Sequence, residues 1–266
     1  MSQADSLSTS KAHAPVAGAA GQTILFVGLW LVWAGLLAAA MLLGNFADGH
    51  SKPAATAARM GSSVALVVTG WAAYALWRHS SAGRFALWIA IGMTLGTIGD
   101  FFNANLLKFI PLENPTLGGI AAFGLGHVAY IAGCFNLGRR AGLTNRTLMI
   151  GAILCWQLVG VVSWYFVVMQ GSESRDLVWP SLGYSLLLAG TAGVATGLAL
   201  QDRRMGWLAL GAALFLASDL ILAFGLFRGS FPHSTEAVWL TYGPGQMFIV
   251  FSTICAALVL ADKRPT

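Results

Sequence analysis

The chain alternates between long apolar stretches and short polar breaks. The stretches lack the strict polar and apolar alternation of a membrane β-strand, so we expect helices. A helix satisfies its own backbone in lipid, and about 20 apolar residues are enough to cross a bilayer. The pattern predicts eight spans, at residues 22–44, 56–77, 85–107, 117–138, 147–169, 178–200, 205–227 and 237–261.

Composition agrees with a protein that meets lipid over most of its surface. Hydrophobic residues make up 57% of the chain and charged residues only 9%, whereas a soluble domain carries about a quarter charged residues. We therefore expect an all-α polytopic membrane protein with a single transmembrane domain at 22–261. A flexible cytoplasmic tail would precede it at 1–21, and a cytoplasmic tail would follow at 262–266.

The positions of lysine and arginine predict that both termini are cytoplasmic, because positive charge gathers on that side of a membrane. In a bacterium this membrane would be the inner one. The net charge of +5 then reflects topology and attraction to anionic lipid. No nucleic-acid partner is expected, since no basic cluster is interleaved with aromatic residues. The cytoplasmic side would hold Lys11, Arg78, Arg84, Arg139, Arg140, Arg146, Arg203, Arg204, Lys263 and Arg264, and the other side Lys52, Arg59, Lys108, Arg175 and Arg228.

Three cysteines, Cys134, Cys155 and Cys255, fall inside the predicted spans. They have neither metal-type spacing nor the even count of a disulfide framework. We interpret them as small residues of the helix packing.

An internal repeat is suggested by shifting the chain by 119 residues, which brings Asp100 onto Asp219 and Trp88 onto Trp207. The shift equals four spans, so it preserves direction across the membrane. It predicts parallel repeats with halves at 22–138 and 147–261.

Four polar residues of separate spans are predicted to share one layer near mid-membrane depth. Asp100, Asp219, His127 and Gln246 each lie about ten residues from the non-cytoplasmic end of a span, which corresponds to about 13–15 Å. Each central aspartate costs about 2.5–3.5 kcal/mol to insert. Packing alone does not explain that cost, although hydrogen bonding between helices is an alternative reading. We predict that Asp100 and Asp219 share a proton in a water-poor chamber and act as general acid and base.

His127 has three readings: a proton carrier, a hydrogen-bond donor to Asp100, or a core histidine. Tyr130 lies one helical turn further on and is placed to orient it. No second histidine follows at helical spacing, so we expect no metal. A zinc site of one histidine and two aspartates is the alternative.

Small and polar residues surround the two aspartates. Gly92, Gly96 and Gly99 follow helical spacing with Asn103 and predict a face that a neighbouring helix approaches closely. Ser218 precedes Asp219 without a Gly-x-Ser-x-Gly elbow, which favours a packing hydroxyl over a nucleophile.

A Gly-Pro-Gly segment around Pro244 predicts a kink in the last span. Broken backbone at membrane depth is tolerated where it lines a cavity. Tyr242 and Gln246 are therefore predicted to face such a cavity, and a simple packing kink is the alternative.

These residues resemble the lysoplasmalogenase (YhhN-type) family of multi-pass membrane proteins over roughly residues 25–262. This chain departs from the family pattern Thr-Tyr-Tyr-x-Ala-Gln in the last span, because Gly243 replaces the second tyrosine and Gly245 replaces the alanine. The departure leaves the cavity shape and the substrate identity open. The resemblance rests on Gly99-Asp100, His127 with Tyr130, Ser218-Asp219, Thr241-Tyr242 with Gln246 and, more weakly, Lys52-Pro53.

The resemblance implies hydrolysis of the vinyl ether bond of a lysophospholipid, releasing a fatty aldehyde and a glycerophospho-head group, with no cofactor. Asp100 and Asp219 would serve as acid and base, in either order. Membrane lipids would surround the protein, and the oligomeric state is left open. Residues that would position substrate or water are His127, Tyr130, Tyr242, Gln246, Asn103 and Ser218.

Two other functions share these features. A proton-coupled transporter also uses parallel repeats, a midplane acidic pair and a broken helix. A non-catalytic lipid-binding protein could use the same scaffold. Release of aldehyde separates the hydrolase from both.

Overall fold

A computed structural model describes residues 16–45, 53–112 and 114–262. Within these ranges eight helices are long and apolar enough to cross a membrane, which confirms the predicted all-α, eight-span architecture. Lys11, Lys52, Lys263 and Arg264 lie outside the described residues, as does most of each predicted tail. The helices are α1 (Val16–Asn45), α2 (Pro53–Trp77), α3 (Gly83–Asn103), α4 (Pro115–Ala141), α5 (Arg146–Trp164), α6 (Val178–Ala199), α7 (Gly206–Arg228) and α8 (Ser234–Asp262).

The predicted spans match these helices to within a few residues, except at two ends. Helix α1 begins at Val16 and so includes the last part of the predicted tail, and α3 ends early. This helix ends at Asn103, although the apolar pattern continues to residue 107. Asn105 adopts a left-handed backbone with φ of 56°, and the chain leaves the helix there. Asp100 therefore lies one turn before the end of its helix, closer to that end than predicted. A short π-helix, Tyr165–Met169, extends α5.

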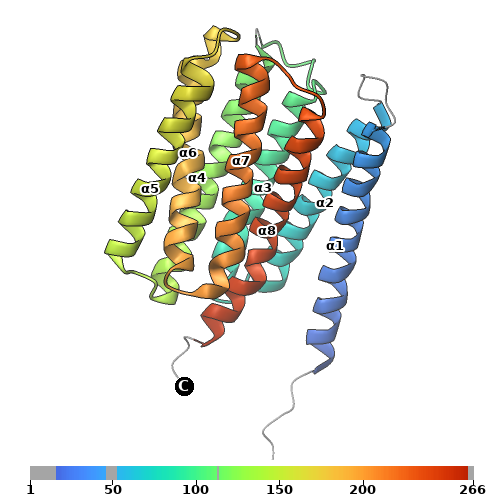
Figure 1. Ribbon diagram of the computed structural model, residues 1–266. Coiled ribbons are helices and arrows are strands. Elements are labelled where there is room, and N and C mark those ends of the chain that lie inside the picture. The colour runs from blue at the N-terminus through green and yellow to red at the C-terminus, as the bar shows by residue number, and fades with distance from the viewer. Residues whose placement is uncertain (1–15, 46–52, 113, 263–266) are drawn as a thin grey trace, which may run out of the picture.

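The helices stand side by side in one bundle, with α1 at one edge and α5 at the other (Figure 1). Helix α1 packs mainly on α2, and α5 mainly on α6. The described chain begins and ends at the same end of the bundle, where Val16 starts α1 and Asp262 closes α8 (Figure 1). This arrangement agrees with termini on one side, while the choice of the cytoplasmic side stays a prediction.

Glycines allow α3 to lie directly against α4, as their spacing predicts. A Cβ at Gly92 would come within 2.3 Å of the Tyr130 ring, and one at Gly99 within 2.6 Å of the Phe123 ring. Real Cβ atoms do not approach so closely, so these positions exclude any side chain. The close contact brings the aromatic side chains of α4 up to the backbone beside Asp100.

The segment around Pro244 does not divide the last span. Helix α8 runs from Ser234 to Asp262 with Pro244 inside it, so the span continues through this segment, and the kink stays a prediction. The neighbouring glycines serve packing instead. A Cβ at Gly243 would lie 2.9 Å from Leu37, and one at Gly245 would lie 3.0 Å from the carbonyl oxygen of Gly211.

The cysteines are free thiols with different surroundings. Cys134 is buried, Cys255 is half-buried and Cys155 is exposed. The packing interpretation therefore fits Cys134 best. The parallel repeat also stays a prediction, because α3 packing on α4 and α7 on α8 agrees with it without establishing it.

Candidate active site

A polar cavity of about 450 Å³ lies between α2, α3, α7 and α8. Asp100 and Asp219 both line it, from α3 and α7 respectively. The two carboxyl groups therefore face a common space, and no hydrogen bond joins them within the described chain. Other lining residues include Thr56, Arg59, Asn103, Phe123, Ser230, Ser234, Trp239 and Tyr242.

Asp100 is buried, with 5% of its surface exposed. Ser63 of α2 donates its hydroxyl to Asp100 Oδ2 at 2.6 Å, and Tyr242 of α8 donates to the same oxygen at 2.9 Å. Asp100 Oδ1 has no hydrogen-bond partner among the described side chains and is the oxygen left for a ligand or water. Two donors on a single oxygen stabilise negative charge on this carboxyl group.

A chain of hydrogen bonds leads from α4 to Asp100. Tyr130 donates to Gln246 Oε1 at 3.0 Å, and Gln246 Nε2 donates to the Tyr242 hydroxyl at 3.1 Å. Tyr242 then donates to Asp100. All donors point the same way, so each bond polarises the next toward the carboxylate. The arrangement makes Asp100 a terminal acceptor.

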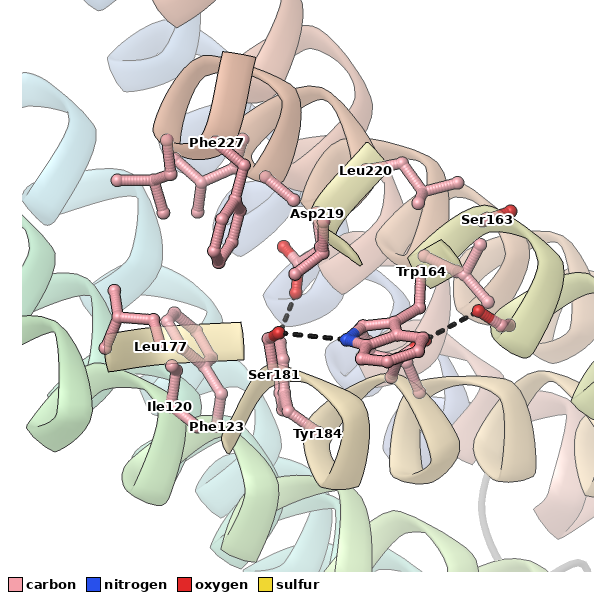
Figure 2. Close-up of a pocket in the computed structure, with 18 of the residues that line it drawn as sticks. Ile120, Phe123, Ser163, Trp164, Leu177, Ser181, Tyr184, Asp219, Leu220 and Phe227 are labelled. Atoms are coloured by element: carbon pink, nitrogen blue, oxygen red, sulfur yellow. Dashed lines mark hydrogen bonds between the residues drawn. The ribbon is translucent and has the colours of Figure 1, made fainter. Parts of the chain in front are cut away.

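A second, narrower cavity of about 80 Å³ lies on the other side of Asp219 and is lined mostly by apolar side chains. Figure 2 shows the Asp219 carboxyl group in this cavity, with Trp164, Leu220 and Phe227 around it. Tyr184 of α6 donates a short hydrogen bond to Asp219 Oδ2. Ser218 Oγ lies 3.4 Å from Asp219 Oδ1.

Asp219 lies where the polar and apolar cavities meet. Asp219 and Phe123 line both of them, and Asp100 lines only the polar one. A ligand with a polar part and an apolar part can therefore occupy both cavities with its junction beside Asp219. The other residues common to both linings are Asn103, Leu222 and Leu226.

His127 is not part of this space. It is 1% exposed and lines neither cavity. Its Nδ1 pairs with the Thr191 hydroxyl at 2.9 Å, and its ring packs edge-on against Phe215 at 4.6 Å between centroids. Of its three readings, the hydrogen bond to Asp100 is not formed, and the core histidine agrees best with these contacts. Tyr130 contacts the ring of His127 but directs its hydroxyl to Gln246.

The other predicted positioning residues divide into those that line a cavity and those that do not, and Gln246, which was predicted to face the cavity, lines neither. Asn103 and Tyr242 line the polar cavity, and Asn103 lines the apolar one as well. Ser218 donates to the carbonyl oxygen of Phe215 in its own helix at 2.6 Å, which agrees with a packing hydroxyl. Among the residues described, no group of three histidine, cysteine or acidic side chains is placed to hold a metal ion.

Sequence reasoning missed three polar residues of the site. Ser63 and Tyr184 each donate to one aspartate, and Arg59 lines the polar cavity with only 5% of its surface exposed. Arg59 was used only to assign topology, although an arginine inside an apolar span is itself a signal. Serine and tyrosine are too common in helix packing to be selected without knowing which way the helix faces.

The bundle and its two cavities define a class: a polytopic membrane protein in which two aspartates, the buried Asp100 and the half-buried Asp219, line one polar cavity. A profile of the YhhN family matches residues 54–253, and the chain belongs to this family.

Curated relatives of the chain carry the name lysoplasmalogenase. The human protein, Lysoplasmalogenase TMEM86B, is 28% identical over 187 residues, which cover 70% of this chain and 72% of the relative. The Lysoplasmalogenase of Mycobacterium bovis is 25% identical over 246 residues, covering 85% of this chain and 83% of the relative. No solved structure matches the chain.

Proposed function

We propose that this protein is an integral-membrane hydrolase that cleaves the vinyl ether bond of lysoplasmalogen-like lysophospholipids. The products are a fatty aldehyde and a glycerophospho-head group. Family membership and the names of the relatives support this reaction class. The observation that carries the proposal is the position of Asp219 at the junction of a polar and an apolar cavity, facing the space that Asp100 lines.

The two cavities suit the two halves of such a lipid. Its vinyl ether group joins a polar glycerophospho part to a hydrocarbon chain. The polar cavity would take the glycerol side, and the apolar cavity would take the first methylene groups of the chain. The double bond would then lie beside Asp219, with its chain-side carbon toward the apolar cavity.

Asp219 is the proposed general acid. Its proton passes to the chain-side carbon of the double bond, a new C–H bond forms, and the ether-bearing carbon becomes an oxocarbenium ion. Tyr184 holds the Asp219 carboxyl group in place through its hydroxyl. The carboxylate that remains stabilises the positive charge next to it.

Asp100 is the proposed general base. The hydrogen bonds from Ser63 and Tyr242 favour its ionised form. It accepts a proton from a water molecule in the polar cavity as that water adds to the oxocarbenium carbon, which gives a hemiacetal.

Collapse of the hemiacetal restores both carboxyl groups. Asp100 returns its proton to the glycerol oxygen as the C–O bond breaks. The hemiacetal hydroxyl gives its proton to Asp219 as the aldehyde forms. The net change is the addition of one water molecule, and the cycle involves no oxidation or reduction.

The proposal includes a single transmembrane domain with both termini cytoplasmic, which the shared end of α1 and α8 supports. The head-group cavity would then open toward the non-cytoplasmic side. It lies near the beginnings of α2 and α8, at Thr56 and Ser234.

Purified protein in lipid nanodiscs, supplied with paired lysolipids, tests the proposal. One lipid carries a 1-alkenyl chain, and its matched control carries the saturated 1-alkyl chain with the same head group. We expect fatty aldehyde from the alkenyl lipid alone. Absence of aldehyde from the alkenyl lipid would refute the proposal, and pH-driven uptake of solute into liposomes would then favour a transporter.

A further inference from the structure

Arg59 of α2 is a buried cation at the wall of the polar cavity, near the beginnings of α2 and α8. It is 5% exposed, and its Nε has no hydrogen-bond partner in the described part of the chain. Its counter-charge is Glu236 of α8, whose Oε1 lies 3.6 Å from Arg59 Nη2. That separation is an ion pair rather than a hydrogen bond, so much of the guanidinium donor capacity is unused.

Helix α1 closes over this ion pair from the other side. A Cβ at Gly44 would lie 3.0 Å from both Arg59 Nη2 and Glu236 Oε1. Arg59 is therefore largely held away from water, where an unsatisfied guanidinium donor is costly, while Glu236 is half-buried. A packing role alone does not account for an arginine whose Nε is left without an acceptor.

The surroundings of Arg59 suit an anion. Ser234 and Thr235, in the first turn of α8, line the same cavity, and so does Ser230 just before it. The first N–H groups of a helix have no partner within the helix and carry a partial positive charge. A guanidinium beside a helix N-terminus is an arrangement that binds phosphate.

Arg59 is also at a useful distance from the proposed chemistry. It precedes Ser63 by one turn of α2, about 6 Å along the helix axis, and Ser63 donates to Asp100. That spacing is comparable with the reach of a glycerol backbone. A lipid whose ether group lies between Asp100 and Asp219 would bring its phosphate to Arg59.

We infer that Arg59, with the first turn of α8, forms a phosphate subsite that binds the head group of the lysolipid. The guanidinium would donate to the phosphate oxygens, and Glu236 would balance the charge of Arg59 while the site is empty of substrate. The inference rests on the proposed function for the identity of the lipid. Beyond that function, the inference states that the polar cavity recognises the phosphate group of the lipid.

The first test compares two substrates with the same alkenyl chain, a lysophospholipid and the phosphate-free alkenylglycerol. Arg59→Gln is expected to raise KM for the lysophospholipid by about tenfold to a hundredfold, because a charge-assisted contact is lost. The KM for alkenylglycerol and kcat for both should change little. Arg59→Lys keeps the positive charge but loses the paired N–H donors of the guanidinium, so its KM should lie between those of the wild type and Arg59→Gln.

Lys108→Gln is the matched control. Lys108 is an exposed cation between α3 and α4 that lines neither cavity, so its loss should leave both KM values unchanged. Glu236→Gln removes the competing carboxylate and should lower KM for the lysophospholipid. Equal losses on both substrates in Arg59→Gln would overturn the inference, and so would a raised KM in Glu236→Gln.

Inorganic phosphate distinguishes the two sources of the anion. Competitive inhibition of the wild type by phosphate, weakened in Arg59→Gln, would assign a general phosphate site. If phosphate does not inhibit the wild type, while Arg59→Gln still raises KM for the lysophospholipid only, the subsite binds the phosphate of the lipid head group alone.

A binding measurement keeps this inference separate from the proposed reaction. A saturated alkyl lysophospholipid cannot undergo the vinyl ether reaction, so its binding to protein in nanodiscs reports the subsite alone. We expect weaker binding in Arg59→Gln than in wild type, and equal binding of alkylglycerol by both. This result would stand even if no aldehyde were formed, whereas equal lysophospholipid affinity in the two proteins would overturn the inference.

Discussion

Asp100 and Asp219 face the same polar cavity, and each accepts a hydrogen bond from the helix that precedes its own in the chain. Ser63 of α2 donates to Asp100, and Tyr184 of α6 donates to Asp219. Beyond this common feature their surroundings differ. Asp100 ends a chain of donors that begins at Tyr130, while Asp219 borders the apolar cavity.

The difference between the two aspartates indicates how one cavity can separate two proton-transfer roles. A carboxyl group that receives several donors is stabilised as an anion and can accept a proton from water. A carboxyl group beside an apolar chain is positioned to deliver a proton to carbon. In the proposed mechanism, the two aspartates therefore take separate tasks because their neighbours differ.

Removing either carboxyl group should have the largest effect. Asp100→Asn and Asp219→Asn are each expected to lower kcat/KM for aldehyde release by about 10²–10⁴-fold, the usual contribution of a positioned acid or base. Asp176→Asn is the matched control, because Asp176 is an exposed acid whose carboxyl group accepts from Asn114 outside both cavities. Aldehyde release at the wild-type rate by either cavity variant would contradict the shared mechanism.

Azide distinguishes the two losses from each other. It is a nucleophile that needs no general base, so it should restore lipid turnover in Asp100→Asn, measured as disappearance of the alkenyl lipid. The same salt should not restore Asp219→Asn, because protonation of carbon comes first. If azide restored turnover in Asp219→Asn alone, Asp219 would be the general base and Asp100 the general acid.

The hydrogen-bond chain gives a graded prediction. Tyr242→Phe removes the donor that touches Asp100, and kcat should fall by about tenfold to a hundredfold, as for a lost bond to a charged group. Tyr130→Phe removes a bond at the far end of the chain and should cost less. Steady-state kinetics of both variants check the order, and a larger loss in Tyr130→Phe would contradict a chain that ends on Asp100.

A substitution in the apolar cavity should have the smallest effect on turnover. Ala223 lines only the apolar cavity, and Ala223→Phe should occupy the space of the first methylene groups. The expected rise in KM is about tenfold, equivalent to roughly two methylene groups at about 0.8 kcal/mol each. A propenyl analogue, whose chain ends before the cavity, should be unaffected, and an equal loss on both lipids would point to misfolding instead.

The fold was predictable because lipid exposure leaves a simple signal in the sequence. Long apolar stretches predicted the spans. The start of α1 was placed too late, and the end of α3 too late as well, since the left-handed backbone at Asn105 interrupts an apolar pattern that continues past it. Counting residues along each span also predicted that Asp100 and Asp219 lie at a similar depth in the membrane. The structure places both in one cavity.

The hydrogen-bond partners were less predictable because they depend on how each helix is rotated. Tyr242 and Gln246 were both expected to face the cavity, but only Tyr242 lines it, while Gln246 turns toward Tyr130. His127 has the same depth but turns toward Thr191 on α6. Only the packing of α4 against α6 decides this, and a single sequence does not carry that information.

Solvent isotope labelling tests the central claim most directly. The alkenyl lysolipid is hydrolysed in D₂O, and the released aldehyde is trapped at once and analysed by mass spectrometry. Proton delivery from Asp219 to carbon predicts a solvent deuteron on the carbon next to the aldehyde group, formed by the wild type and strongly reduced in Asp219→Asn. Aldehyde without that deuteron, or with it at the same rate in Asp219→Asn, would contradict the account.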